Sequence, residues 1–145
     1  MPDDARAKTP LHQTRVTRLV RLVWVWGPAF LVMAAIYSVS SLQDIGPLPG
    51  DLSDKTGHFG GYALLGAVVI RATAGARWTG VTGQSALVAW VICALYGVSD
   101  EWHQGFVPGR TVALDDWVAD AAGAATAILA IAAVARVMRR RARTV

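Results

Sequence analysis

Long apolar segments separated by short polar connections dominate the pattern of this chain. Residues 22–43 and 78–99 contain no charged side chain, and residues 121–135 are apolar and rich in Ala. A helix needs about 20 mostly apolar residues to cross the hydrocarbon core of a bilayer. The first two segments reach that length, and the third reaches it when its helix starts at Asp116. These three segments therefore predict three spanning helices.

A shorter apolar run, residues 56–70, predicts one more helix. Its length corresponds to roughly 22 Å of helix, less than a hydrocarbon core of about 30 Å. Extending the helix to residues 54–73 closes the gap, with Arg71 reaching back to the interface. We therefore predict an all-α, integral membrane four-helix bundle with short outer loops. Its helices are expected at about residues 22–41, 54–73, 82–103 and 116–135.

The length of 145 residues predicts a single domain. Hydrophobic residues make up 54% of the chain and charged residues 17%, which is apolar-heavy for a soluble domain. We expect a transmembrane domain at residues 19–136, after a basic, disordered N-terminus (residues 1–18) and before a basic tail (residues 137–145). No A-x-A-like site follows the first apolar segment, which favours a retained helix over a cleaved signal peptide.

Basic residues alternate between the two sides of the predicted helices. Of the 14 lysines and arginines, all but Lys55 and Arg110 lie before the first helix, between the second and third, or after the fourth. The positive-inside rule therefore predicts N-in/C-in topology in a bacterial cytoplasmic membrane, with Lys55 and Arg110 on the outer side. Because the basic termini flank membrane spans, we expect them to contact anionic lipid and not nucleic acid.

Polar side chains gather at the predicted outer ends of three helices. At the start of the second helix, Asp54, His58 and Tyr62 are spaced by four residues and share one face. Asp54 fits a helix cap, as does Ser53 before it, and it fits a site residue equally well. His58 lies deeper, where an unpaired imidazole is costly, so a functional role is favoured for it.

At the end of the third helix, Asp100, His103 and Gln104 fall on one face, and Glu101 points about 100° away. Acidic residues at a helix C-terminus oppose the helix dipole. Residues that break such a local rule are often paired or functional. The group as a whole is therefore a candidate site.

The segment that follows is predicted to turn tightly at Pro108-Gly109-Arg110. Two interpretations of Arg110 stay open: it pairs with Asp116 or Asp120, or its guanidinium binds an anionic headgroup. Asp116 is a candidate N-cap of the fourth helix, whereas Asp120 lies one turn further in and is not explained as a cap.

Small residues on the fourth helix predict how Asp120 is oriented. Ala119, Gly123 and Ala127 form a stripe that favours close packing against another helix. Such packing would bring Asp120 towards the other polar groups.

These observations define a set of candidate ligand-binding residues. They are Asp54, Lys55, His58, Tyr62, Asp100, Glu101, His103, Gln104, Arg110, Asp116 and Asp120. The candidates for catalysis among them are His58, Asp100, His103 and Asp120. Histidines and carboxylates at one depth are able to hold a metal, but their spacing matches no established metal motif, P-loop or nucleophile elbow. The sequence therefore predicts no metal and no cofactor.

Three motifs together resemble the VanZ-like family of small bacterial membrane proteins. They are Asp54-Lys55-x-x-His58-Phe59-x-x-Tyr62, Tyr96-Gly97-x-Ser99-Asp100-Glu101-x-His103-Gln104-x-Phe106-Val107-Pro108-Gly109-Arg110, and Asp116-x-x-x-Asp120-x-x-Gly123. The resemblance covers about residues 20–135. It implies a cell-envelope role and, through the family's namesake, a link to resistance to the glycopeptide teicoplanin. Asn often stands in the family where this chain has Asp120.

Three functions remain open from the sequence. The first is a non-enzymatic protein that binds a cell-envelope lipid or lipid-linked precursor at its outer face, where Lys55 and Arg110 would meet an anionic headgroup. The second is a membrane-embedded hydrolase or transferase acting on a lipid-linked or glycolipid substrate, with His58 or His103 as general base. The third is a structural protein whose polar groups only hold the bundle together.

Overall fold

A computed structural model describes residues 11–43 and 54–143, and this part of the chain is all-α, with no strand. The expectation of an all-α fold is confirmed for these residues. The elements are α1 (Leu11–Ser40), α2 (Asp54–Thr73), the short 3₁₀ helix η1 (Trp78–Gly80), α3 (Gly83–Gln104) and α4 (Leu114–Arg141).

The first and last helices are longer than expected. α1 already begins at Leu11, inside the segment that was expected to be disordered, because no Gly or Pro interrupts residues 11–26. α4 begins at Leu114, and its N-cap is Ala113. The expectation that Asp116 caps this helix is therefore wrong: Asp116 lies in the first turn, where its carboxylate complements the helix dipole. Residues 1–10, and Ser53 as a cap of α2, lie outside the described residues.

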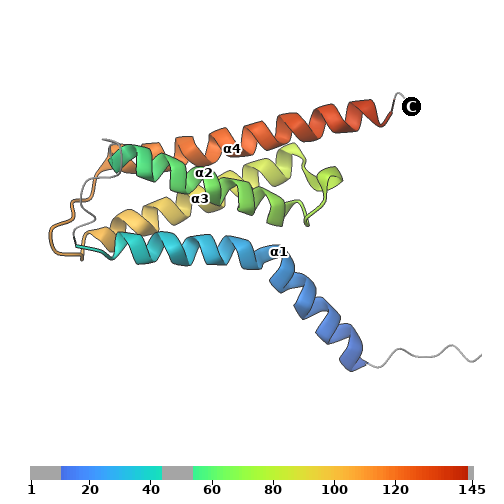
Figure 1. Ribbon diagram of the computed structural model, residues 1–145, viewed down its shortest axis with the longest axis horizontal. Helices are drawn as coiled ribbons and strands as arrows, with labels where there is room; N and C mark the ends of the chain where they lie inside the picture. The colour runs from blue at the N-terminus through green and yellow to red at the C-terminus, as the bar shows by residue number, and fades with distance from the viewer. Residues whose placement is uncertain (1–10, 44–53, 144–145) are drawn as a thin grey trace, which may run out of the picture.

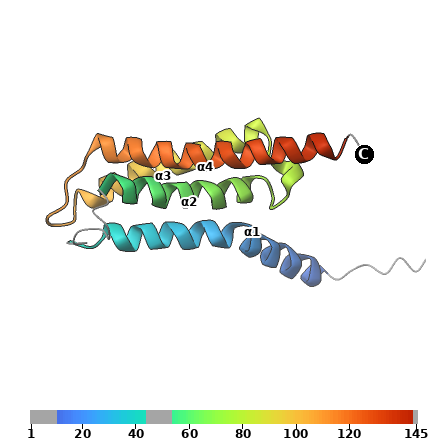
Figure 2. The ribbon, with the colours of Figure 1, turned by 45° about the horizontal axis from the view of Figure 1, so that its top comes forward.

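The helices pack in a layered bundle in which α2, α3 and α4 lie side by side (Figures 1 and 2). α2 and α4 make the most extensive contact. A Cβ added at Gly123 of α4 would lie 2.2 Å from the carbonyl oxygen of Phe59, and one added at Gly66 of α2 would lie 2.7 Å from that of Ala124. The predicted close packing of the small-residue stripe is confirmed, since the two backbones approach too closely for side chains there.

α1 joins the bundle with its second half only. Figure 1 shows α1 bending, so that its first half leaves the other helices. Pro28 lies inside α1. Proline has no N–H to donate and its ring crowds the carbonyl four residues earlier, here that of Trp24, which accounts for the bend.

The outer surface of the bundle is strongly apolar. The core is small and includes Leu65, Val69 and Ile128, whereas large apolar side chains such as Leu31, Leu95 and Leu129 are exposed. Among the described helices, residues Arg15–Ser40 and Leu114–Arg141 are long and apolar enough to cross a membrane. α2 and α3 are not among these candidate spans; both carry charged residues near their ends. A topology of four spans therefore stays a prediction.

Charged side chains separate between the two ends of the bundle. The α2–α3 connection lies at the same end as the C-terminus of α4 (Figure 1). There Arg139 donates hydrogen bonds to the carbonyls of Trp78 and Val81, at 3.1 and 2.6 Å. At the opposite end, α2 and α4 begin and α3 ends, and the acidic side chains of the three motifs lie there.

Candidate functional site

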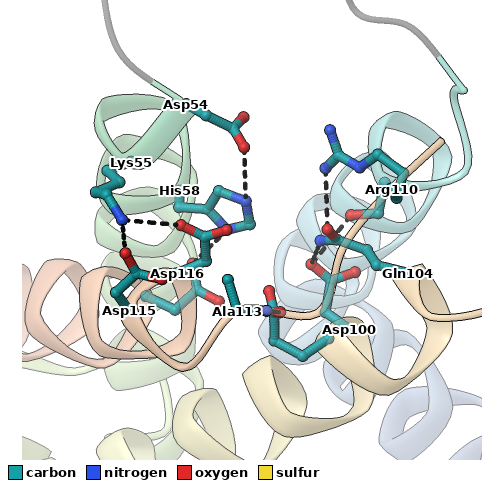
Figure 3. A network of polar contacts seen from close by, with 12 residues as sticks. Asp54, Lys55, His58, Asp100, Gln104, Arg110, Ala113, Asp115 and Asp116 are labelled. Carbon is teal, nitrogen blue, oxygen red and sulfur yellow. Dashed lines mark hydrogen bonds and ion pairs between the residues drawn. The ribbon is translucent and has the colours of Figure 1, made fainter.

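Polar side chains from α2, α3, α4 and the α3–α4 connection meet at this acidic end (Figure 3), and Ser40 of α1 joins them. They form two networks. One joins α1 to α3 and to the turn that follows α3, and the other joins α2 to the start of α4. Both networks are built from residues far apart in the sequence.

The first network is centred on Asp100. Ser40 of α1 and Gln104 of α3 both donate hydrogen bonds to Asp100 Oδ2, at 3.0 and 3.2 Å. Arg110 Nη2 in turn donates to Gln104 Oε1 at 3.1 Å. Ser40, Asp100 and Gln104 are all buried, so the network ties the end of α1 to α3 in an apolar setting.

A tight turn places Arg110 against this network. The Arg110 N–H donates to the Val107 carbonyl at 3.1 Å, and Gly109 has a φ of 84°. Proline followed by a glycine of positive φ is typical of a type II turn, so the predicted turn is confirmed. Within the described residues, Arg110 contacts Gln104 and forms no ion pair with Asp116 or Asp120. Of the two interpretations that the sequence left open for Arg110, the pairing with one of those carboxylates is therefore wrong.

His103 faces α1. Its ring stacks on Tyr37 with the centroids 4.4 Å apart, and its Nε2 shares a 3.0 Å hydrogen bond with Ser41 Oγ. These contacts anchor the end of α1 to α3. They do not connect His103 to a carboxylate, so the hypothesis of His103 as a carboxylate-oriented base loses its geometric support.

His58 is the centre of the second network. Its Nδ1 lies 3.0 Å from Oδ1 of Asp120, and its Nε2 lies 3.9 Å from Oδ2 of Asp54, one turn earlier in α2. The His58 side chain is 8% exposed and that of Asp120 is fully buried. Asp120 therefore fixes the orientation of the imidazole from the neighbouring helix, an arrangement common to catalytic and metal-binding histidines.

Lys55 closes this network towards the surface. It forms an ion pair with Asp115 and lies 3.7 Å from Asp116 Oδ1. The Lys55 and Asp115 side chains are more than half exposed, whereas Asp116 is largely buried. Lys55 thus balances the acidic first turn of α4.

Glu101 contacts the start of α4 from the side of α3. Its Oε2 accepts a 2.9 Å hydrogen bond from the backbone N–H of Ala113, the N-cap of α4. Ala113 has no side chain that can cap the helix, so Glu101 supplies an acceptor for this helix end from another helix. Glu101 is buried, although it points away from the Asp100 face as helical phase predicts.

A cavity of about 300 Å³ opens between α1 and the two networks. Its apolar wall comes from α1 (Val32, Ala35, Ile36 and Val39) and from Leu64 of α2. Its polar lining is formed by Ser40, Asp54, His58, Tyr62, Asp100 and Arg110. The cavity is therefore amphiphilic, with ionisable groups from α2, α3 and the α3–α4 connection.

Some buried polar atoms of this end lack partners. Within the described residues, Tyr62 Oη, Asp100 Oδ1, Glu101 Oε1 and Asp120 Oδ2 are buried without a hydrogen-bond partner. Buried polar groups in proteins are nearly always hydrogen-bonded, so orphaned ones call for an explanation such as a bound ligand. Two of these atoms, on Tyr62 and Asp100, belong to residues that line the cavity.

The structure thus sorts the candidate residues by position. Those lining the cavity are Asp54, His58, Tyr62, Asp100 and Arg110. The candidates that do not line it are Lys55, Glu101, Gln104, Asp116, Asp120 and His103, the last of which faces α1. Sequence reasoning did not select Tyr37, Ser40 and Ser41, although their place at the end of the first apolar segment puts them at the depth of the site.

Comparison with known proteins gives one match. No curated protein and no solved structure matches the chain. The model of the VanZ/LLP1 family matches residues 5–136, which include all four helices apart from the last turn of α4. The matched segment contains both polar networks and every residue that lines the cavity. The chain therefore belongs to the VanZ/LLP1 family.

Proposed function

We propose that this protein binds a cell-envelope lipid or lipid-linked precursor in the cavity between α1 and α2. One observation carries the proposal: Tyr62 Oη and Asp100 Oδ1 are buried, unpartnered among the described residues, and belong to residues lining a cavity whose other wall is apolar. A ligand with an acyl or prenyl chain and a polar headgroup matches both the apolar wall and the polar lining of this cavity. Its hydroxyl or amide groups would satisfy Asp100 and Tyr62.

Arg110 gives this site a preference for an anionic headgroup. It lines the cavity and uses Nη2 to contact Gln104. A guanidinium has five N–H donors in a planar fork that suits phosphate oxygens, so Arg110 is able to bind a phosphate while it keeps Gln104. Lys55 does not line the cavity and is paired with Asp115 and Asp116.

The proposed setting is the bacterial cytoplasmic membrane, with N-in/C-in topology. The apolar outer surface and the two candidate spans support a membrane location. The distribution of basic residues supports a cytoplasmic position for the end that carries Arg139, which puts the cavity on the outer side. A role in tolerance of teicoplanin-type glycopeptides is proposed through the family alone.

Two neighbouring glycines allow a sharp test. Gly61 lines the cavity and Gly60 does not, and a Cβ added at either would meet nothing within 4 Å. Gly61→Leu should fill the cavity without disturbing helix packing, and Gly60→Leu is the matched control. Native mass spectrometry of the detergent-purified protein would measure binding of a polyprenyl phosphate, phosphatidylglycerol and an uncharged diacylglycerol.

We expect the two anionic lipids to bind the wild type, Gly61→Leu to lose most of that binding, and Gly60→Leu to keep it. Arg110→Gln should lower binding of the anionic lipids and leave the uncharged one unchanged. Equal binding by the Gly61→Leu and Gly60→Leu variants would exclude the cavity as the lipid site.

A second candidate function, a membrane-embedded hydrolase or transferase, is favoured by the His58–Asp120 pair. His58 faces the cavity and Asp120 orients it at 3.0 Å, as a general base requires. Turnover of a glycolipid or lipid-linked phosphate that disappears in His58→Gln would support it. The purely structural alternative leaves the orphaned oxygens unexplained, since a self-contained network would satisfy them.

A further inference from the structure

Behind the cavity, a ring nitrogen of His58 and one carboxylate oxygen each of Glu101 and Asp120 all lie within 4.8 Å of one another. The three residues come from α2, α3 and α4. We propose that they bind a divalent transition-metal ion such as Zn²⁺. The proposed metal group shares His58 with the lipid cavity, but neither Glu101 nor Asp120 lines that cavity, so variants of the two carboxylates test metal binding separately from lipid binding.

The unpartnered oxygens of the two carboxylates point to a ligand here. Glu101 Oε1 and Asp120 Oδ2 are buried and accept no hydrogen bond within the described residues. Asp120 is fully buried and Glu101 is 6% exposed. Buried carboxylate oxygens are nearly always hydrogen-bonded or metal-bound, since burying an uncompensated charge is costly.

The direction of Asp120 fits this interpretation. A Cβ added at Gly97 would lie 3.3 Å from Asp120 Oδ2, so this oxygen faces α3 at Gly97. Glu101 follows Gly97 by four residues and therefore shares that face of α3. Gly97 leaves the space in which Asp120 approaches the glutamate.

Charge balance also favours a cation. Two buried carboxylates here share one imidazole, and the basic side chains of this end are engaged elsewhere: Lys55 with Asp115 and Asp116, and Arg110 with Gln104. Imidazole nitrogen together with two carboxylate oxygens is a donor set suited to Zn²⁺, Mn²⁺ or Fe²⁺. Bonds of about 2.0–2.2 Å to one ion would draw the three side chains closer together.

A second group, Asp54, His58 and Asp116, also lies within 4.8 Å. It is the weaker alternative for two reasons. The Asp54 side chain is 59% exposed, and Lys55 lies 3.7 Å from Asp116, where it already balances the charge and would repel a metal. The two groups share only His58, so variants of the carboxylates separate them.

The test uses full-length protein in detergent, stripped with a chelator and reloaded with Zn²⁺. The metal content is measured after dialysis, and Co²⁺ loading gives a visible spectrum that reports nitrogen and oxygen ligation. Asp120→Asn and Glu101→Gln are the test variants, because each keeps an oxygen that can accept from His58 or from the Ala113 N–H. Asp115→Asn, at the same end but outside the group, is the matched control.

We expect the wild type and Asp115→Asn to retain about one Zn²⁺ per chain and to gain thermal stability from it. Asp120→Asn and Glu101→Gln should each weaken binding at least about tenfold while keeping helical content and a monodisperse elution profile. Wild-type binding no tighter than that of Asp120→Asn would overturn the proposal. So would loss of binding in Asp116→Asn with retention in both test variants, which would assign the metal to the outer group.

Discussion

Arg71 of α2 donates a 3.1 Å hydrogen bond to the carbonyl of Trp24, the carbonyl that Pro28 leaves without its helical donor. The same Nη1 donates to the next carbonyl, that of Val25, also at 3.1 Å. The guanidinium carbon lies 5.4 Å from the centroid of the Trp24 ring, within the range of a cation–π contact. Arg71 therefore stabilises the bend of α1 by supplying hydrogen-bond donors to its carbonyls, a role that adds to the expected one at the membrane interface.

Replacing Arg71 should loosen α1 specifically. Arg71→Met keeps an unbranched apolar stem but removes the donors, and we expect a loss of about 1–3 kcal/mol in the free energy of unfolding. Arg77→Met, which replaces an exposed arginine in the α2–α3 connection, is the control and should change stability little. Denaturant titration in detergent measures both. Equal losses in the two variants would contradict a role at the bend.

Gly123 should be intolerant of even one methyl group. Its Cβ would lie 2.2 Å from the Phe59 carbonyl oxygen, which is backbone and cannot move aside without separating α2 from α4. We expect Gly123→Ala to cost about 1–3 kcal/mol. Gly60→Ala meets nothing within 4 Å and should be neutral or stabilising by up to about 1 kcal/mol, because Ala favours helix over Gly. Thermal unfolding of the two variants measures this difference in stability, and equal losses in both would contradict it.

The two histidines of the polar end should differ in function. His58→Phe replaces a group that lines the cavity and pairs with Asp120, so it should abolish the lipid binding proposed above. His103→Phe keeps an aromatic ring for Tyr37 and loses one hydrogen bond to Ser41, so binding should stay within about twofold and stability should fall by about 1 kcal/mol. Loss of binding in His103→Phe with retention in His58→Phe would instead indicate that the binding site lies at the contact between His103 and α1.

The ion pair at the surface should contribute little. The Lys55 and Asp115 side chains are 53% and 64% exposed, and exposed pairs typically contribute between 0 and about 1 kcal/mol. Asp115→Asn should therefore lower the free energy of unfolding by less than about 1 kcal/mol, and the difference from wild type should shrink as salt is raised. A large, salt-independent loss would mean that Asp115 does more than pair with Lys55.

Helical periodicity was sufficient to predict much of this architecture. The spacing of Asp100, Gln104 and Glu101 correctly separated two faces of α3, and Gly123 with its small neighbours correctly indicated close packing. The length of α1 was underestimated because hydropathy stops at the first arginines, whereas backbone hydrogen bonding does not. Asp116 was misplaced as a cap because α4 begins earlier, at Leu114, where Glu101, distant in the sequence, supplies an acceptor for the helix end.

The partners within the site depended on tertiary structure. The position of Ser40 and Ser41 at the end of the first apolar segment indicates their depth but not their partners, and in the structure they bond Asp100 and His103. For Arg110 the sequence left open a pairing with Asp116 or Asp120 and binding to an anionic headgroup, and the turn at Gly109 aims it at Gln104, away from those two carboxylates. Pairings of this kind are set by the angles between helices, which periodicity does not encode.

The docking of α1 relies on its main chain as well as on its side chains. Arg71 bonds the carbonyls of Trp24 and Val25, and Tyr96 of α3 donates a 2.7 Å hydrogen bond to the carbonyl of Met33. Carbonyls are the same whatever residue carries them. The outward-facing side chains of α1, such as Phe30 and Leu31, are therefore free to vary over evolution or to be replaced in design without loss of these attachments. The donors Arg71 and Tyr96, which lie on other helices, should tolerate far fewer substitutions.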